Sequence, residues 1–324
     1  MRILVVGGAG YIGSHMCKLL AGAGHEVVVA DNLGTGHREA VQWGPLVEVS
    51  IGDVAALGPV FDRYRFDAVM HFAAYSLVAE SVTDPFKYYQ NNVAATLALL
   101  RVMRDKGVAR FVFSSTAAVF GEPQQELIDE AHPVVPINPY GASKLMVERV
   151  LADAAAAYGL RAVALRYFNA AGADPEGLIG ESHEPESHLI PRLLRRAAGD
   201  TLDVKIFGSD YPTPDGTCIR DYIHVNDLCA AHLLALEYLD GHAGFHSFNL
   251  GNGTGYSVRQ VVTAVEAVIG RSLGIESAAR RPGDPARLVA SSALAREVLG
   301  WRPALADLQT IIASAWRWHQ APKF

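Results

Sequence analysis

Cysteine is scarce in this chain of 324 residues: the three present, Cys17, Cys218 and Cys229, are far apart and form no C-x-x-C pair. A small secreted domain held by disulfides has an even number of cysteines in a spaced framework. We therefore expect three reduced thiols in a cytoplasmic protein, each packed as a small hydrophobic side chain.

Net positive charge and long apolar runs are also absent. The formal charge is −6, 19% of the residues are charged, and no block of like charges occurs. This balance disfavours binding to nucleic acid or to an anionic membrane, and no apolar run is long enough to span a bilayer. The start MRILVVGGAGYIG reaches glycine after six residues, so it fits a first strand better than a signal peptide.

The first half of the chain alternates short β-branched runs with helical patterns. The runs are RILVV, EVVVA, LVEVS, DAVMHF, RFVFS and RAVALRY, and the clearest helical segments are Tyr11–Ala23, Pro85–Asp105 and Tyr140–Ala157. Six strands with crossover helices are typical of an α/β fold with a doubly wound parallel sheet of the Rossmann type.

The amino-acid composition of the sequence changes after Tyr167. Glycine, proline, histidine and glutamate crowd GADPEGLIGESHEPESHLIP, and the later strands DVKIF, FHSFNL and RLVAS are shorter. The length suggests about two domains, so we expect a Rossmann-type domain over 1–167 and a smaller α/β substrate domain over 168–324. Some segments of the second should pack back on the first. Its helices are expected from near Ile190 and at 225–239, 257–269 and 304–318.

The stretch VVGGAGYIGSH lies between the first strand and the first helix. Gly7, Gly10 and Gly13 have G-x-x-G-x-x-G spacing, and Gly8 completes G-x-G-x-x-G with the last two. Glycines here permit a tight turn, close helix–strand packing and close approach of the backbone to a pyrophosphate. An ordinary glycine-rich turn has the same letters, but the position after the first strand favours a dinucleotide site.

Acidic and small residues end the next strands. Asp31 ends the second strand eighteen residues after Gly13, where a carboxylate binds the adenosine ribose and repels a 2′-phosphate. An exposed turn aspartate would look the same, yet beside the glycine loop it favours NAD over NADP. GDV at Asp53 and HFAA at Phe72–Ala74 follow the third and fourth strands, whose carboxyl ends border the crevice for dinucleotides.

The stretch PYGASK places Tyr140 and Lys144 four residues apart at the start of a predicted helix, which puts both side chains on one face. A phenol has a pKa near 10, so a nearby ammonium and an oxidised nicotinamide are needed to make phenolate accessible near neutrality. Y-x-x-x-K alone is common, but here SSTAAVFG offers hydroxyls at the end of the preceding strand. The parts together predict a Ser/Thr–Tyr–Lys set that transfers protons beside a nicotinamide.

On these motifs the chain resembles the UDP-glucose 4-epimerases of the extended short-chain dehydrogenase/reductase superfamily. The similarity runs through GGAGYIGSH, DNL, HFAA, FSSTAAVFG, PYGASK, LRYFN, HLIP, NLGNG and RRPGD. The glycine loop and Y-x-x-x-K identify only the superfamily, whereas DYPTPDGTCIRDYIHV is far more specific. The resemblance implies NAD as cofactor, a UDP-sugar as substrate, and inversion of sugar carbon 4 through a 4-keto intermediate.

The resemblance also implies roles for individual residues. Thr116 and Tyr140 are expected at the sugar 4-hydroxyl, with Lys144 on the nicotinamide ribose. The expected cofactor contacts are Gly7, Gly10, Tyr11, Ile12, Gly13, Asp31, Asn32, Asp53, Val54, Phe72, Ala73, Ala74, Asn91, Ser114, Tyr140, Lys144 and Tyr167. The expected nucleotide-sugar contacts are Thr116, Tyr140, Phe168, Asn169, His188, Leu189, Phe207, Arg220, Tyr222, Arg281, Asp284 and Leu288.

Two positions depart from the family's pattern. Ser76 stands where some members carry a lysine near the cofactor. The resemblance places Leu288 beside the sugar's 2-substituent, where members carry either a bulky tyrosine or a small cysteine, so acceptance of N-acetylated sugars stays open. A 4-epimerase of UDP-N-acetylglucosamine or of a UDP-pentose would share every catalytic residue.

Two further alternatives are a nucleotide-sugar 4,6-dehydratase and a non-catalytic NAD-binding regulator. The dehydratases carry Asp-Glu directly after the threonine to eliminate water across carbons 5 and 6, whereas this chain has Ala117 and Ala118. A regulator could discard the proton-transfer set, which is complete here.

The cluster ESHEPESH holds His183 and His188 among several acids. It lacks the H-E-x-x-H spacing, and the resemblance places His188 at the nucleotide-sugar, so we expect no metal site. The segments Pro85–Asp105 and Tyr140–Ala157 carry mixed apolar faces. In this superfamily the equivalent helices often pair into a four-helix dimer interface, which predicts a homodimer.

Overall fold

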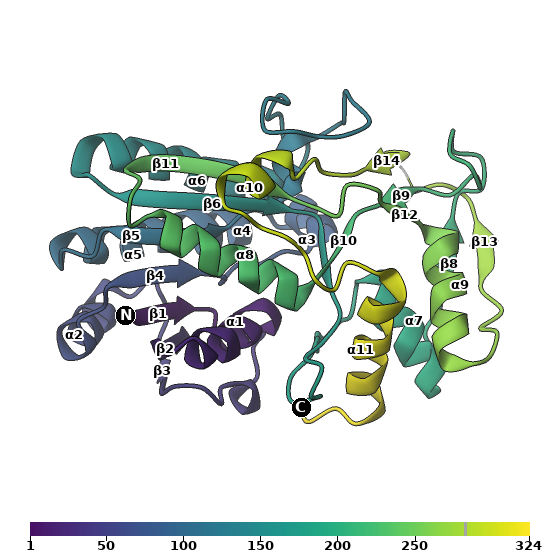
Figure 1. Cartoon of the computed structure of the whole chain (residues 1–324), viewed down its shortest axis with the longest axis horizontal. Helices are drawn as coiled ribbons and strands as arrows, with labels where there is room; N and C mark the ends of the chain where they lie inside the picture. The colour runs from purple at the N-terminus through teal and green to yellow at the C-terminus, as the bar shows by residue number, and fades with distance from the viewer. Residues whose placement is uncertain (282–283) are drawn as a thin grey trace.

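The centre of the molecule is a seven-stranded parallel sheet (Figure 1) with the strand order β11-β6-β5-β4-β1-β2-β3. The computed structural model describes residues 1–281 and 284–324. The strands of the sheet are β1 (Arg2–Val6), β2 (Glu26–Asp31), β3 (Leu46–Glu48), β4 (Ala68–His71), β5 (Arg110–Ser114), β6 (Arg161–Tyr167) and β11 (Gly244–Leu250). The predicted doubly wound α/β fold is confirmed.

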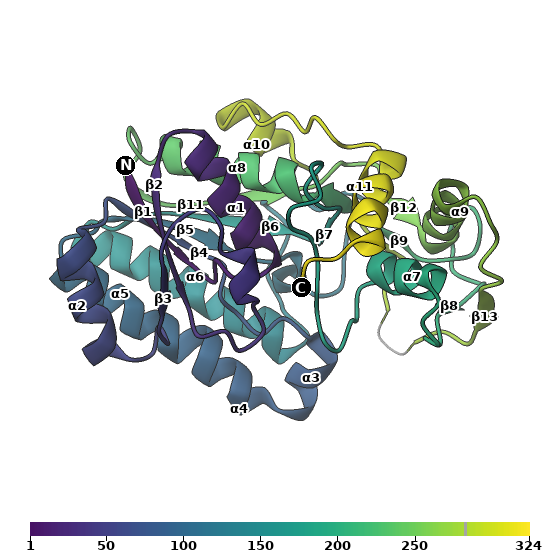
Figure 2. The same cartoon turned by 90° about the horizontal axis from the view of Figure 1, so that it is seen from below.

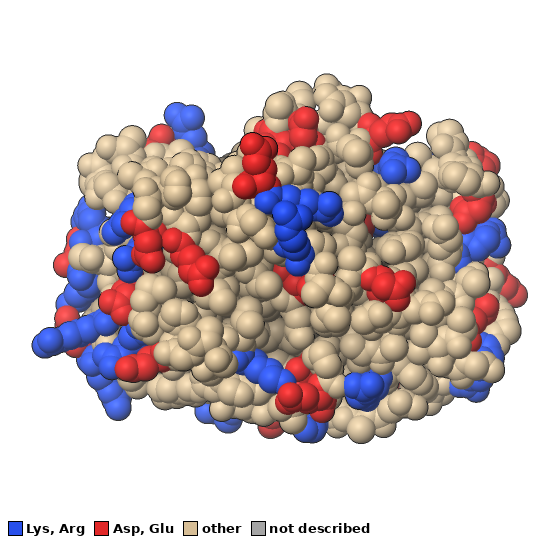
Figure 3. Space-filling model, viewed as in Figure 1, with Lys and Arg blue, Asp and Glu red and all other residues tan. Residues whose placement is uncertain are grey.

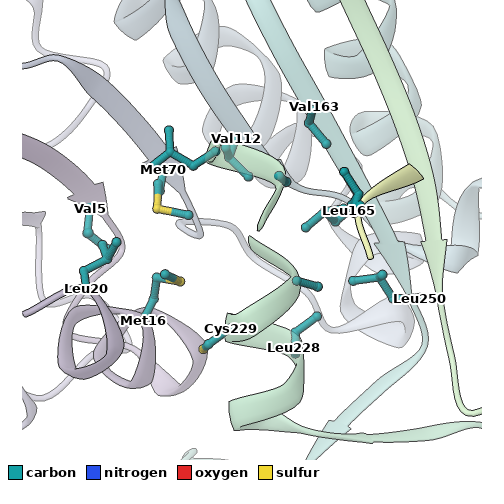
Figure 4. Packing of buried hydrophobic residues seen from close by; sticks show 14 of the residues in the cluster. Val5, Met16, Leu20, Met70, Val112, Val163, Leu165, Leu228, Cys229 and Leu250 are labelled. Atoms are coloured by element: carbon teal, nitrogen blue, oxygen red, sulfur yellow. The ribbon is translucent and has the colours of Figure 1, made fainter. Parts of the chain in front are cut away.

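Helices cover both faces of this sheet because successive side chains of a strand point to opposite faces. Ile3 and Val5 belong to a buried cluster with residues of α1 (Tyr11–Gly22) and α8 (Val225–Tyr238). Figure 4 shows part of this layer, including Met16 of α1 and Cys229 of α8. Leu4 and Val6 belong to the cluster on the other face, which is formed with α2 (Val54–Tyr64), α5 (Ala95–Asp105) and α6 (Pro139–Tyr158).

Most of the C-terminal half forms a smaller unit beyond the carboxyl edge of the sheet (Figure 2). Helices α7 (Leu189–Ala198), α9 (Val258–Ile269) and α11 (Leu308–Gln320) share one buried cluster. The short strands there are β7 (Asn169–Ala171), β8 (Lys205–Phe207), β9 (Ile219–Arg220), β10 (Tyr222–His224), β12 (Tyr256–Ser257), β13 (Glu276–Ala278) and β14 (Arg287–Leu288). They form three small sheets, β10-β7, β12-β9-β14 and β13-β8.

All six strands predicted for the first half are present, but the sheet has a seventh. Strand β11 comes from the predicted second domain and pairs with β6 along its whole length, from Gly244 opposite Arg161 to Leu250 opposite Tyr167. Helix α8 comes from the same half and covers the sheet. These two elements are the segments expected to pack back, and the boundary at residue 168 stays a prediction.

Several element boundaries differ from the predicted ones. Helix α11 begins at Leu308, four residues later than predicted, because the Asp307 carboxylate accepts from the backbone N–H of Thr310 at 2.9 Å and caps the helix there. The predicted strand RLVAS is reduced to the two residues of β14. The segment Pro85–Asp105 divides into α4 (Pro85–Tyr88), a π-helical turn η2 (Tyr89–Ala94) and α5.

The remaining short elements lie around the sheet. They are α3 (Val78–Thr83), α10 (Ala293–Val298) and the 3-10 turns η1 (Arg38–Ala40) and η3 (Ala117–Phe120). Within the described residues, no helix is both long and apolar enough to cross a membrane. Basic and acidic side chains are interspersed on the face seen in Figure 3.

Candidate active site

The predicted cofactor residues gather where β1, β2, β4 and β5 end, which is the carboxyl edge of the parallel sheet. The backbone N–H of Gly7, just after β1, donates to Ala30 of β2 at 2.9 Å. The carbonyl of Val6, the last residue of β1, accepts from the backbone N–H of Phe72, which follows β4. Parallel strands bring these chain segments to one edge, so residues from four parts of the sequence border one site.

The three glycines of the first loop differ in what surrounds them. Gly7 has φ +79°, and a β-carbon there would lie 2.5 Å from the Ala73 nitrogen. A β-carbon on Gly13 would lie 2.1 Å from the Gly7 carbonyl oxygen. Packing within the protein therefore requires glycine at both positions.

Gly10 is different, because a β-carbon there would meet only the Gly7 oxygen at 3.4 Å, an ordinary contact. Gly10 immediately precedes α1, where unpaired backbone N–H groups favour an anion. The protein's own packing does not require glycine here. A bound pyrophosphate that approaches the backbone explains it, so the loop fits a dinucleotide.

Asp31 connects the glycine loop to the end of β2. Its carboxylate accepts from the backbone N–H of Ala9 at 3.0 Å and of Leu33 at 2.8 Å. The side chain of Asn32 accepts from the Gly34 N–H at 3.0 Å. The predicted ribose acid is thus held beside the predicted pyrophosphate loop.

The other predicted cofactor residues have separate structural roles that fix their positions. Asp53 caps α2 by accepting from the Ala56 N–H at 3.0 Å, and the side chain of Val54 is exposed. Tyr11 donates its hydroxyl to the Gly172 carbonyl at 2.6 Å. Asn91 lies in η2 and donates to the side chain of Asn92 at 3.0 Å. None of these contacts tests the predicted contact with NAD.

Tyr140 and Lys144 lie in the first two turns of α6. Asn138 caps this helix through a 2.8 Å hydrogen bond from the Gly141 N–H, and Pro139 occupies the first turn. Lys144 is only 3% exposed, and its ammonium donates to the Ser114 carbonyl at the end of β5 at 2.7 Å. The helix start and the strand end are therefore joined through the lysine.

Two hydroxyl groups from β5 and its following turn complete this arrangement. Ser114 forms a hydrogen bond with the hydroxyl of Tyr167 at the end of β6. Thr116 is buried, and its Oγ1 accepts from the Ala118 N–H at 3.1 Å at the start of η3. Sequence spacing had predicted that the serine, threonine, tyrosine and lysine act as one set, and the fold brings them to one edge of the sheet.

Burial governs the ionisation of the tyrosine and the lysine. It lowers the pKa of Lys144 to about 7, against an opposing effect of Glu148. It raises the pKa of Tyr140, which hydrogen bonding to Thr116 lowers in part. In the protein alone the Tyr140 phenol is neutral at pH 7, so the phenolate requires the further positive charge that an oxidised nicotinamide brings.

A buried ion pair beneath these residues was missed from the sequence. Arg166 of β6 and Glu148 of α6 approach to 2.5 Å with both side chains buried. Ser115 donates to the same carboxylate at 2.5 Å. A charged residue inside the apolar run of β6, and a glutamate one helical turn after Lys144, were the available signals.

The predicted nucleotide-sugar residues of the C-terminal half approach one another in pairs. The Arg281 guanidinium lies 3.9 Å from the centre of the Phe207 ring. Arg220 of β9 lies 3.4 Å from the Asp284 carboxylate and pairs with Leu288 of β14. Of the motif RRPGD, the Pro-Gly pair at 282–283 lies outside the described residues.

An apolar wall connects this group to the catalytic turn. Leu288 and Phe168 pack against a small buried cluster that includes Ala117 and Phe120 of η3. Leu288 therefore lies near Thr116 in space although 172 residues separate them in the chain. Its contact with the sugar stays a prediction.

The remaining predicted substrate residues have contacts within the protein. Asn169 donates to the Asp221 carbonyl at 2.8 Å. Tyr222 packs in the core of the C-terminal unit, where burial raises its pKa to about 12. His188 and Leu189 stand at the start of α7, the histidine exposed and in contact with Glu181. Their contacts with substrate stay predictions.

Comparison with known proteins agrees with this arrangement. Residues 3–251 match the NAD dependent epimerase/dehydratase family. A UDP-glucose 4-epimerase from Streptococcus mutans is 53% identical over 326 residues, which cover 99% of this chain and 97% of that protein.

Solved structures give the same result. A UDP-glucose 4-epimerase from Brucella ovis in complex with NAD is 52% identical, with a TM-score of 0.94 and 97% of each chain covered. One from Stenotrophomonas maltophila, with bound NAD and formylated UDP-arabinopyranose, is 40% identical, with a TM-score of 0.95 and 99% of this chain and 98% of that chain covered. The resemblance noted from the sequence is confirmed, and the chain belongs to the UDP-glucose 4-epimerases of the NAD dependent epimerase/dehydratase family.

Proposed function

We propose that this chain interconverts UDP-galactose and UDP-glucose through the residues at the carboxyl edge of the sheet. It is an NAD-dependent nucleotide-sugar 4-epimerase. The observation that carries the residue assignment is the placement of Tyr140 and Lys144 on the first two turns of α6. The lysine there donates a hydrogen bond to the Ser114 carbonyl.

Tyr140 is the proposed acid and base. As phenolate it removes the proton from the sugar 4-hydroxyl, and as phenol it returns a proton to the 4-keto sugar. Thr116 shares the proton path, because its hydroxyl both donates and accepts hydrogen bonds. Lys144 holds the Ser114 carbonyl and places a positive charge near the phenol when protonated.

NAD, when bound, supplies the hydride chemistry that side chains lack, by accepting hydride from carbon 4 and returning it. The glycine loop and Asp31 would hold this group at the ends of β1 and β2. The reaction is redox-neutral overall, so the cofactor should stay bound through turnover.

Inversion requires the ketone to present its other face. We propose that the UDP part stays anchored by Phe207, Arg220 and Arg281 while the sugar rotates about its link to the pyrophosphate. The forked guanidinium groups suit a pyrophosphate because they carry a fixed charge and several donors. The apolar surface of Leu288 and Phe168 offers no polar group that would hold the sugar in a single orientation.

The sugar range is the open part of the proposal. Leu288 is intermediate in size between the tyrosine and the cysteine of the family pattern, so UDP-N-acetyl sugars and UDP-pentoses stay alternatives. Dehydration is disfavoured because Ala117 and Ala118 supply no acid or base after Thr116. A regulator without catalysis is disfavoured because the proton-transfer set is complete.

The test uses untagged protein with UDP-galactose, UDP-N-acetylgalactosamine or UDP-arabinose, followed by NMR without added NAD. We expect conversion of UDP-galactose, and a fall of about 10²–10⁴-fold in kcat for Tyr140→Phe, with NAD content and UDP affinity unchanged. Tyr158→Phe, at the exposed end of the same helix, should keep full activity. No conversion of any sugar, even with added NAD, would contradict the function, and an active Tyr140→Phe would contradict only the residue assignment.

We also infer a homodimer. Besides Tyr158 at the end of α6, five large apolar side chains are exposed on helices α3 to α6, which lie on one side of the sheet (Figure 2). They are Val78, Val82, Phe86, Leu97 and Met146. An exposed apolar patch of this kind is typical of a protein interface. A cytoplasmic location stays a prediction, supported by the three free buried thiols.

A further inference from the structure

The connection between β7 and α7 contains a group of four side chains, of which only His188 has a predicted contact with the substrate. Glu181, His183, Glu186 and His188 each offer one possible ligand atom, and these four atoms all lie within 4.8 Å of one another. The sequence predicted no metal here because the spacing lacks H-E-x-x-H. The folded chain brings the four donors together without that spacing.

The distances between donor atoms suit a small cation. His183 Nδ1 lies 3.3 Å from Glu181 Oε1 and 3.7 Å from Glu186 Oε2, and His188 Nδ1 lies 4.0 Å from Glu186 Oε1. Tetrahedral zinc, with bonds of about 2.0–2.2 Å to nitrogen and oxygen, separates its ligand atoms by about 3.4 Å. Only the closer contact between His188 and Glu181 must open to admit the ion.

The two carboxylates of this group are buried and need a balancing charge. The side chains of Glu181 and Glu186 are only 4% and 2% exposed. Among the residues that the structure describes, neither carboxylate forms a salt bridge with lysine or arginine, and each is paired only with the two histidines. Buried carboxylates require compensating charge. Against the effect of burial, Glu181 and Glu186 raise the pKa of His183 to about 10 and that of His188 above its ordinary value, so protonated imidazoles balance the carboxylates in the protein without an ion. One divalent cation between two neutral imidazoles would balance the same charge.

The segment that carries the donors is held in place from outside. The Glu181 carbonyl accepts from the indole N–H of Trp318 at 3.1 Å. A side chain of His37 lies 3.1 Å from the Ser182 carbonyl. A β-carbon on Gly180 would lie 2.3 Å from the Trp318 ring, so the backbone rests on α11. These contacts fix the backbone that carries the donor side chains. Supporting contacts of this kind orient the ligands of a metal site.

The site also has a way in. The His188 side chain is 48% exposed, whereas the two carboxylates are buried beneath it. Two imidazole nitrogens with two carboxylate oxygens form a donor set that suits zinc better than calcium or magnesium, which prefer oxygen alone.

We propose that Glu181, His183, Glu186 and His188 form a zinc site that fixes the start of α7. The site is structural, because the four side chains are themselves sufficient ligands for a closed tetrahedral ion. It tethers the β7–α7 connection beside Tyr11, whose ring centre lies 6.3 Å from that of His183. It is separate from the proton-transfer set on α6.

The test measures zinc binding to the full-length, untagged protein after dialysis against a chelator. Competition with a chromogenic chelator should give one Zn²⁺ per chain. Loss of a residue that only supports a ligand weakens metal binding by about 10–100-fold. His183→Gln removes a ligand itself, so it should weaken zinc binding by more than about 100-fold. His242→Gln, which changes an exposed histidine in the loop after α8, should leave binding unchanged.

A second measurement covers the case in which the variant folds poorly. Co²⁺ added to the wild-type protein should give the visible absorption of a tetrahedral site, and Zn²⁺ should raise the Tm of wild type but not of His183→Gln. Two protonated histidines could balance the carboxylates without any ion. In that case wild type and His183→Gln would bind zinc equally weakly, or not at all, and the proposal would be overturned.

Discussion

Gly10 and Gly13 look equivalent in the sequence, but their surroundings assign them different tasks. Gly13 is required by contact with the Gly7 carbonyl, and Gly10 is not required by any contact within the protein. The fold therefore requires glycine at position 13, and we propose that ligand binding requires it at position 10. Two glycines of one motif are thus subject to two different constraints.

This difference gives a paired prediction. Gly13→Ala should lower the free energy of unfolding by about 1–3 kcal/mol through overpacking. Gly10→Ala should leave stability within about 0.5 kcal/mol but weaken NAD binding tenfold or more, which corresponds to about 1.4 kcal/mol. Urea unfolding and titration with NAD measure the two effects. Equal effects of both variants on NAD affinity at unchanged stability would refute this division.

Lys144 gives a prediction about pH. Its pKa in the folded protein, about 7, lies below that of the unfolded chain, near 10.4. Between these values the unfolded state binds more protons, so the free energy of unfolding rises with pH. From pH 7.5 to 9.5 the wild type should gain about 2 kcal/mol relative to Lys144→Met.

Urea unfolding of the protein without cofactor at both pH values measures this gain. Lys323→Met, at the exposed C-terminus, is the control and should follow the wild type. The groups that act on the Lys144 charge are His71 and Glu148. Parallel behaviour of wild type and Lys144→Met would show that the burial of Lys144 does not shift its pKa.

Helix α6 carries its functional side chains at intervals of four residues. Tyr140, Lys144 and Glu148 lie on one face, and the glutamate joins the helix to β6 through Arg166 and to β5 through Ser115. The ion pair therefore fixes the helix against the two strands whose ends hold the hydroxyl groups. It thereby holds the helix turns that carry the proposed catalytic residues Tyr140 and Lys144.

Removing one partner of this pair should be costly. Glu148→Gln leaves Arg166 buried without its anion, and we expect a loss of about 3–5 kcal/mol in the free energy of unfolding. The neighbouring variant Arg149→Gln breaks an exposed pair with Asp153 and should cost no more than about 0.5 kcal/mol. Urea unfolding compares the two. A loss in Glu148→Gln no larger than in Arg149→Gln would contradict the role of the buried pair.

Among the residues that the structure describes, several exposed apolar side chains lie on helices α3 to α6. Phe86 of α4 is 82% exposed, and the other exposed apolar residues of α3 to α6 lie on helices that pack together. A monomer would leave these side chains in water at an unfavourable free energy, whereas pairing with a second copy would bury them.

Sedimentation velocity at micromolar concentration tests this inference. The wild type should sediment as a dimer, and Phe86→Asp should shift it toward the monomer because the charge would have to be buried. Val298→Asp, on α10, is a matched exposed substitution outside this group of helices and should stay dimeric. A monomeric wild type would contradict the inferred homodimer.

Local patterns were enough to predict the first six strands, the glycine loop and the Tyr140–Lys144 pair. Each depends on neighbours within one strand, one turn or one helix, so residue spacing fixes the geometry. The same holds for the start of α9, where Ser257 and Gln260 form a capping box. The end of a helix or strand was less predictable where a single cap, such as Asp307, decided it.

The amino-acid sequence alone determined the α/β class and the family, and it predicted the dinucleotide loop and the proton-transfer residues. It did not place β11 beside β6, join Glu148 to Arg166, bring Leu288 to the wall beside Thr116, or gather Glu181, His183, Glu186 and His188 close together. The first three of these join residues far apart in the chain, and the fourth depends on how a proline-containing turn folds against α11. Such contacts follow from the packing of whole helices and strands, and the spacing of residues within one element does not determine that packing.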